Sequence, residues 1–390
     1  MTGLTHIIGW AHTRFGKLDH PDVEALIADV SASALADAEL DAADVDAISV
    51  GVFGAGFSRQ SFDAALVGAG APELARIRAV RSENACATGS AALYAAFDMV
   101  AARTANVVLV VGAEKMTGVS GQEIGDILLG CAHLRTEATF GSFAGVFATL
   151  ARQYSERYGS LRETLAAIAA KNHHNAVTNP VAHMRRDLGV DFCATVSKSN
   201  PVVADPLLRT DCSLVSDGAA AVVVTSPDVA RAARRSVAIS GRSQTNEPMA
   251  LAARRDPLSF DGAGRAFRAA LAQAASDVSE LDLIETHDCF TMAELLQYEA
   301  FGLAAPGKGS TLLAQGHTAR DGILPVNVSG GLKAKGHPIG ATGVSQHVMA
   351  AQQLVGEAGE MQLPRAAQAL VFNMGGAAVT NYATVLVGVR

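Results

Sequence analysis

A segment with apolar side chains on nearly every side, residues 90–102, most constrains how this chain can fold. It has the composition of a helix, and its apolar residues are Ala91, Ala92, Leu93, Ala95, Ala96, Phe97 and Val100. A helix that is apolar all round lies inside a large protein, because a surface helix carries polar residues on one face. With 390 residues, of which 49% are hydrophobic and 18% charged, the chain has enough apolar material for such an interior. The segment therefore predicts a large buried core and excludes a disordered protein.

Short β-branched runs alternate with alanine-rich helical stretches along the chain. The predicted strands are residues 47–52, 77–80, 106–111, 219–225, 237–242, 281–284, 369–372 and 380–387. The predicted helices are residues 22–38, 90–102, 147–158, 161–175, 263–275, 293–301 and 344–356. An alternation of this kind is typical of an α/β fold.

The tripeptide Ala-Thr-Gly occurs at 87–89 and again at 341–343. Each copy opens a helix of small residues, and a strand follows each helix. The shared order of elements indicates two related halves. Residues from about 119 to 200 differ in composition from the rest of the chain, with more charge and several histidines. We interpret them as an insertion with a functional role.

Charge and composition exclude several classes of protein. The 31 basic and 38 acidic residues give a formal net charge of −7, which argues against nucleic-acid binding. The N-terminus lacks the features of a secretory signal, and no charge-free apolar stretch reaches the roughly 20 residues that a membrane helix needs. The five cysteines include no C-x-x-C pair, so a disulfide framework is not expected. We therefore expect a soluble cytoplasmic protein with free thiols and no contact with membranes.

Cys86 is the first candidate for chemistry, because it lies between a predicted strand and the start of the apolar helix. The positive end of a helix dipole stabilises a thiolate, which makes a cysteine at that place a better nucleophile at neutral pH. The small residues around Cys86 leave room for a substrate carbonyl. The alternative is a buried structural cysteine, a common fate of a free thiol.

His337 is the candidate base for that nucleophile. It stands in Gly336-His337-Pro338-Ile-Gly-Ala-Thr-Gly, where the glycines form a loop that can expose backbone N–H groups. The alternative is an ordinary tight turn that happens to contain a histidine.

Two further segments carry candidate residues. His287-Asp-Cys289-Phe290 follows the predicted strand 281–284, at the strand end where α/β sheets place ligands. This segment supplies an acid/base thiol and a hydrogen-bond donor, or part of a metal site, or only a loop capped by polar residues. Asn373-Met-Gly375-Gly ends another strand, where the backbone N–H groups form an oxyanion hole or the glycines form only a β-bulge or turn. We expect no metal site, because no second cluster with ligand spacing is present.

Together, and in this order along the whole chain, these segments resemble the thiolase superfamily, and in detail its sterol-carrier-protein branch, which includes acetyl-CoA acetyltransferases. The resemblance implies that Cys86 accepts the acyl group, and that His337 activates it and helps to bind the thioester oxygen. Most thiolases carry a second cysteine in Cys-x-Gly-Gly, but here that position is Asn373. In the branch resembled, Cys289 takes its place. His287 falls where other thiolases hold an oxyanion-hole water, and Gly375 matches a backbone donor shared with the N–H of Cys86.

The resemblance also implies a fold and its organisation. It is a duplicated five-layered α/β/α/β/α fold, in which residues 1–118 and 207–233 form one half and residues 234–390 form the other. Residues 119–206 form an inserted loop domain that covers coenzyme A. Members of the family form homodimers or homotetramers, and they use coenzyme A thioesters as substrates without a permanently bound cofactor.

The activity implied is reversible Claisen condensation and thiolysis, with acyl-CoA and acetyl-CoA as substrates. Three alternatives stay open. The chain could transfer acyl groups to an acceptor other than coenzyme A, together with a small OB-fold partner. It could be a retro-aldolase of steroid side chains, although those relatives tend to lose the nucleophilic cysteine that is present here. It could also be an inactive carrier of coenzyme A or lipid. The motifs leave the acyl chain length and the direction of the reaction open.

Overall fold

The computed structural model describes residues 5–389 of the chain, and its first half is built on five strands. They are β1 (His6–His12), β2 (Ala47–Gly51), β3 (Ala79–Ser82), β4 (Val107–Glu114) and β7 (Gly218–Thr225), in the order β3-β2-β4-β7-β1. β2 runs parallel to both β3 and β4, whereas β7 is antiparallel to β4 and β1. Helix α1 (Val23–Asp37) and the short α2 (Val67–Gly70) lie on the outer face of this sheet, and α3 (Thr88–Ala101) lies on its inner face.

The second half repeats this plan with four strands. They are β8 (Ser236–Asn246), β11 (Thr380–Val389), β10 (Gln368–Gly375) and β9 (Leu283–Glu285), in the order β8-β11-β10-β9. Helix α14 (Ile339–Val355) lies on the inner face, and α10 (Asp261–Gln273) and α11 (Thr291–Ala300) lie on the outer face. The remaining helices of this half are the short α12 (Gly309–Ala314) and α13 (Gly331–Lys335).

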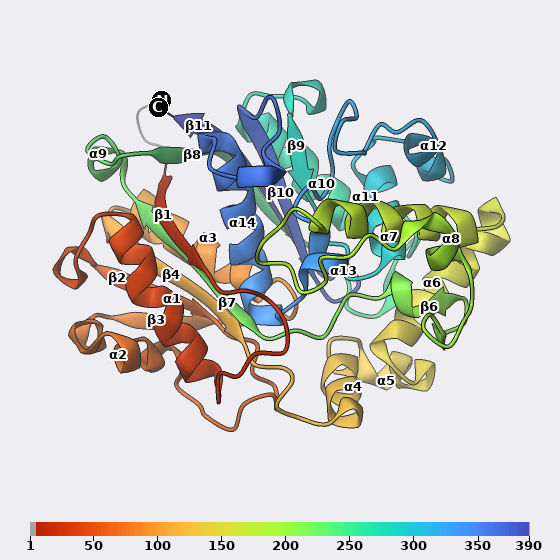
Figure 1. Ribbon diagram of the computed structural model, residues 1–390, viewed down its shortest axis with the longest axis horizontal. Helices are drawn as coiled ribbons and strands as arrows, with labels where there is room; N and C mark the ends of the chain where they lie inside the picture. The colour runs from red at the N-terminus through yellow and green to blue at the C-terminus, as the bar shows by residue number, and fades with distance from the viewer. Residues whose placement is uncertain (1–4, 390) are drawn as a thin grey trace.

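The two halves meet along β1 and β8, where His6 pairs with Ala238 and Ile7 with Val237, so that the nine strands form one continuous order. The strands are buried on both faces, and alternate residues enter different cores. Val222 of β7, for example, packs with α3 and α14, whereas Val223 packs with α1. This places α3 and α14 between the sheets of the two halves, and Figure 1 shows α14 in the middle of the molecule. The predicted five-layered α/β fold is confirmed.

The segment between β4 and β7 packs on the opposite half of the protein. It consists of α4 (Gly121–Leu129), α5 (Leu134–Glu137), α6 (Phe143–Tyr158), α7 (Arg162–Ala176), α8 (Gly189–Ala194), and the strand pair β5 (Val202–Ala204) and β6 (Leu207–Leu208). The short α9 (Pro227–Ala230) lies outside this segment, because it follows β7. Side chains of α6 and α7 share one core with those of α11 from the second half. Figure 1 shows these helices gathered on one side, away from α1 and α2. Domain boundaries at residues 118 and 206 stay a prediction.

Several elements differ from the sequence prediction for physical reasons. β1 was not predicted, because its glycine, alanine and two histidines give a weak strand pattern. α4 was also missed, although Ser120 and Glu123 form a capping box at its start. α14 begins at Ile339, five residues before the predicted residue 344, because the glycines of its first turn are poor helix formers in isolation. β3 lies two residues later than predicted, at Ala79–Ser82. Across residues 5–389, no helix is long and apolar enough to cross a membrane.

The repeated Ala-Thr-Gly tripeptides meet at the centre of the molecule. A Cβ atom on Gly343 would lie 2.3 Å from the backbone nitrogen of Ser90, and one on Gly89 would lie 2.7 Å from the carbonyl oxygen of Gly340. Such distances leave no room for a side chain at either position. The first turns of α3 and α14 therefore touch backbone to backbone, which brings the loops that precede them together.

Gly343→Ala should lower the free energy of unfolding by about 1–3 kcal/mol, because the methyl group must push two buried helices apart. Gly125→Ala is the matched control. It lies within α4, and a Cβ atom there would meet nothing within 4 Å. The control should be neutral or slightly stabilising. Urea unfolding measures both, and equal stability of the two variants would contradict the close helix contact.

Candidate active site

A strained turn presents Cys86 at the start of α3. The preceding residue, Ala85, has φ of +49°, which is a left-handed conformation that a non-glycine residue rarely adopts. The hydroxyl of Thr88 holds this turn, because its oxygen accepts the N–H of Asn84 at 2.9 Å and its proton goes to the carbonyl of Ala85 at 2.7 Å. Backbone strain of this kind costs about 1–3 kcal/mol and is concentrated at functional sites.

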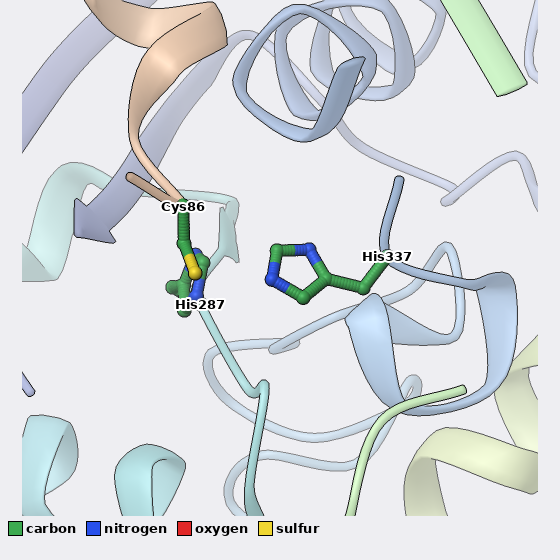
Figure 2. A group of neighbouring side chains, drawn as sticks. All are labelled: Cys86, His287 and His337. Carbon is green, nitrogen blue, oxygen red and sulfur yellow. The ribbon is translucent and has the colours of Figure 1, made fainter. Parts of the chain in front are cut away.

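Cys86 meets two histidines from the second half of the protein. The sulfur of Cys86, one ring nitrogen of His287 and one ring nitrogen of His337 all lie within 4.8 Å of one another. The two imidazole rings have centroids 5.1 Å apart and stand almost perpendicular, at 87°. Figure 2 shows both rings beside the Cys86 sulfur, with His337 approaching from the loop before α14. All three side chains are buried.

Thr342 fixes the protonation of His337. The Thr342 hydroxyl donates its one proton to the carbonyl of Pro338 at 2.8 Å. It must therefore accept from Nδ1–H of His337, which lies 2.7 Å away. This leaves a lone pair on Nε2, which is buried and has no hydrogen-bond partner among the described residues. His337 can thus accept a proton from a neighbouring thiol.

Asn373 fixes His287 in the opposite state. The amide nitrogen of Asn373, which can only donate, lies 2.8 Å from Nδ1 of His287. Nδ1 is then the acceptor and Nε2 carries the proton, again without a hydrogen-bond partner among the described residues. Burial lowers the pKa of His287 to about 4, so the ring is neutral at pH 7. One histidine therefore offers a lone pair and the other an N–H.

The neighbours of Cys86 favour its thiolate form. Interaction with the Cys131 thiol, and then with His287 and His337, holds the pKa of Cys86 well below its usual range, although burial acts in the opposite direction. The same interaction raises the pKa of Cys131 well above its usual range, so Cys131 stays a thiol. No sequence motif singles out Cys131, because it lies outside the motifs and reaches the site through the loop after α4.

Cys289 is buried and lies in the segment that follows β9, as the sequence predicted for its position. Burial, and then the negative charge of Cys86, raise the pKa of Cys289 well above its usual range. The neighbouring Asp288 carboxylate accepts the backbone N–H groups of Leu332 at 2.6 Å and Lys333 at 3.1 Å. This carboxylate joins the His287–Cys289 segment to α13, directly before His337. Burial raises the pKa of Asp288 to about 7.

Gly375 lies against the loop that precedes Cys86. A Cβ atom on Gly375 would lie 2.3 Å from the carbonyl oxygen of Asn84, so only glycine fits. Gly375 ends β10 and pairs with Thr380 of β11, which makes this segment a hairpin turn as well. The two interpretations of the Gly-Gly sequence are therefore compatible.

The Cys86, His287 and His337 cluster is also the one group of three such ligands among the described residues. A cysteine and two histidines are donors that zinc accepts. Their spacing equally suits a nucleophile with a base and a hydrogen-bond donor. Our expectation of no metal stays a prediction.

Comparison with known protein families identifies the chain. Residues 5–228 match the family model described as "Thiolase, N-terminal domain", and residues 243–388 match the model "Thiolase C-terminal domain-like". The chain belongs to the thiolase family. The resemblance in its motifs is thereby confirmed.

Individual relatives in the thiolase family carry different names. An acetyl-CoA acetyltransferase from Methanothermobacter thermautotrophicus is 36% identical over 95% of this chain and 96% of its own length. Human sterol carrier protein 2 is 34% identical over 95% of this chain and 69% of its own length. A solved structure described as "Ltp2-ChsH2(DUF35) aldolase" matches with a TM-score of 0.83 over 100% of this chain and 99% of that one. At 23% identity, that likeness supports the thiolase fold alone.

Alkylation by iodoacetamide tests the electrostatics of Cys86. Because its folded pKa is lowered, Cys86 should stay thiolate and react at nearly constant rate from pH 8 down to pH 7. In urea, where its pKa returns to about 8.5, the rate should fall several-fold over that interval. Cys212 is an internal control, because burial raises its pKa to about 12 and it should stay unlabelled in the folded protein. Peptide mapping by mass spectrometry gives both rates, and identical pH profiles for folded and unfolded Cys86 would contradict this description.

Proposed function

We infer that this protein is a thiolase-type acyltransferase, which catalyses reversible Claisen condensation and thiolysis of coenzyme A thioesters through an acyl group on Cys86. The observation that supports this most strongly is the cluster of Cys86, His287 and His337 with its two complementary histidines. A thiolate nucleophile, a proton acceptor and a neutral N–H donor within a few ångströms are what acyl transfer needs.

In the first half-reaction, Nε2 of His337 takes the proton of Cys86, and the thiolate attacks the carbonyl carbon of an acyl-CoA. The oxyanion that forms accepts hydrogen bonds from the backbone N–H groups of Cys86 and Gly375. The carbon–sulfur bond to coenzyme A then breaks. The Cys289 thiol gives its proton to the departing sulfur, which leaves an acyl group on Cys86 and a thiolate on Cys289.

In the second half-reaction, the Cys289 thiolate removes a proton from the methyl group of acetyl-CoA. The enolate oxygen accepts two hydrogen bonds. One comes from Nε2–H of His337, which is protonated, and the other comes from Nε2–H of His287, which is neutral. The enolate carbon attacks the acyl group, releases the Cys86 thiolate, and forms a 3-ketoacyl-CoA. Removal of one such oxyanion donor typically costs roughly 10²–10³ in rate. The Cys86 charge contributes to the raised pKa of Cys289, which fits a site where one of the two thiols is ionised at a time.

A basic pocket supports a phosphate-bearing substrate. Arg186, Arg209 and Lys333 line a cavity of about 230 Å³, with the two arginines exposed and Lys333 buried. His173 also lines it but is neutral, because burial lowers its pKa to about 3. Arginine and lysine are the usual partners of phosphate groups. Leu214 also lines this pocket, and the N–H of the adjacent Ser213 donates to the carbonyl of Cys289 at 2.9 Å. The pocket therefore suits the coenzyme A end of the substrate, covered by the segment between residues 119 and 206.

A partner-dependent acyltransferase is the second candidate. The structural relative named "Ltp2-ChsH2(DUF35) aldolase" combines two proteins by its own description, which favours testing for a small partner here. The retained Cys86 speaks against a retro-aldolase.

A homo-oligomer also remains our proposal. It is supported by β3, the outermost strand of its sheet, where Val80 is 44% exposed.

Thiolysis of acetoacetyl-CoA by coenzyme A tests the proposal, followed as loss of the 3-keto thioester. The unmodified protein should turn over without any added component, and Cys86→Ala should reduce kcat at least about 10³-fold, because the covalent step is lost. Cys289→Ala should still accept an acyl group but lose exchange of the acetyl-CoA methyl protons with deuterated water.

Three results would argue against this proposal. Full condensation by Cys289→Ala would exclude Cys289 as the acid/base thiol. Activity that requires an added partner would favour the second candidate. Binding of coenzyme A thioesters without turnover would favour an inactive carrier.

A further inference from the structure

We propose that a cavity beside Cys86 and Gly375 binds a large, uncharged, apolar acyl group, so that the preferred substrates are medium- to long-chain 3-ketoacyl-CoA thioesters rather than acetoacetyl-CoA. This inference rests on the proposed function and names the substrate class of the same site.

The cavity adjoins the turn that carries Cys86 and the end of β10. Its lining includes Asn84 and Ala85, which precede Cys86, together with Gly375 and Cys131. Its volume is about 910 Å³, which falls within the range of roughly 300–1,000 Å³ for pockets that enclose drug-sized ligands. An acetyl group contains two carbon atoms and would leave nearly all of this space empty.

Part of the cavity wall is apolar. Phe53, Ile127, Met249 and Val379 line it, from four segments far apart in the sequence. Aromatic, branched and thioether side chains suit a flexible hydrocarbon chain, because their favourable contacts require no fixed direction.

Helix α4 forms one wall and is incompletely covered by the protein itself. Across Gly121–Leu129 none of its side chains is fully buried, although four of them are large and apolar, namely Ile124, Ile127, Leu128 and Leu129. Figure 1 shows α4 at the lower edge of the molecule, below the sheet of the first half. Of these four residues, Ile127 lines the cavity, so an acyl chain in the cavity would cover it.

The charges around the cavity select against an anionic group. Glu83 and Asp126 line it together with Arg81. The Arg81 guanidinium is already engaged, because it contacts Asp63 at 3.2 Å and donates to the carbonyl oxygens of Val52 at 2.9 Å and Phe53 at 2.6 Å. The two carboxylates would repel the phosphates of coenzyme A and a terminal carboxylate on the acyl chain. The basic pocket beside Lys333 carries the opposite charge, so the two cavities suit opposite ends of one thioester.

Equilibrium binding tests this assignment without requiring turnover. In a Cys86→Ala background, which cannot be acylated, calorimetry compares dodecanoyl-CoA with acetyl-CoA. We expect dodecanoyl-CoA to bind at least about a hundredfold more tightly, a small part of what burial of about ten more methylene groups can supply. Adding Ile127→Trp should fill the cavity and reduce this ratio at least about tenfold. Ile323→Trp is the matched control, because Ile323 is 79% exposed and lies outside the cavity, and it should leave the ratio unchanged.

Turnover by the protein with Cys86 intact distinguishes a failure of the acyl-cavity inference from a failure of the proposed function. A higher kcat/KM for 3-ketododecanoyl-CoA than for acetoacetyl-CoA supports the acyl cavity, and a lower value for the corresponding substrate with a terminal carboxylate supports its charge. Turnover of acetoacetyl-CoA alone, with equal affinity for the two thioesters, overturns this inference and leaves the proposed function standing. Loss of turnover for every substrate would instead count against the proposed function, while the binding ratio still decides the cavity's occupant.

Discussion

The backbone contact between the first turns of α3 and α14 is the constraint on which the rest of the structure depends. Gly89 and Gly343 allow it, since a Cβ atom at either position would overlap the opposite backbone. Both helices are buried between the sheets, so neither can move away to make room for a side chain at this contact. Their N-terminal ends therefore meet, and the loops before them, which carry Cys86 and His337, are brought within reach of each other. The duplicated halves thus bring Cys86 of the first half beside His287 and His337 of the second.

Two buried carboxylates stabilise this arrangement by accepting backbone N–H groups, one across the junction of the two halves and one within the second half. Glu114 of β4 accepts those of Phe53 at 2.9 Å, Gly54 at 3.1 Å and Gly340 at 3.1 Å, so the first half is bonded to the start of α14. Asp288 serves the same purpose between the His287 segment and α13. Burial raises the pKa of Glu114 and Asp288, each to about 7. Such groups are costly to bury, and several hydrogen bonds each are needed to keep them in place.

The sequence was sufficient for the parts of the site that lie in motifs. Cys86, His287, His337 and Gly375 could be named because short polar or glycine-rich segments interrupt long apolar ones. It was insufficient where a role depends on distant contacts. Cys131 lies in no motif, and Asn373 was noted only as a departure from Cys-x-Gly-Gly, although its amide sets the protonation of His287. Likewise, the Ala-Thr-Gly repeat indicated two halves, but the physical reason for the glycines is the helix contact, which no local pattern contains.

Acylation of the intact protein is the measurement that tests this account most directly. Three buried thiols, Cys86, Cys131 and Cys289, influence one another's ionisation, and we propose that Cys86 alone is the nucleophile. After brief mixing with an acyl-CoA and acid quenching, mass spectrometry should show a gain of one acyl group, and peptide mapping should place it on Cys86. An acyl group on Cys131 or Cys289, with Cys86 unmodified, would contradict the account.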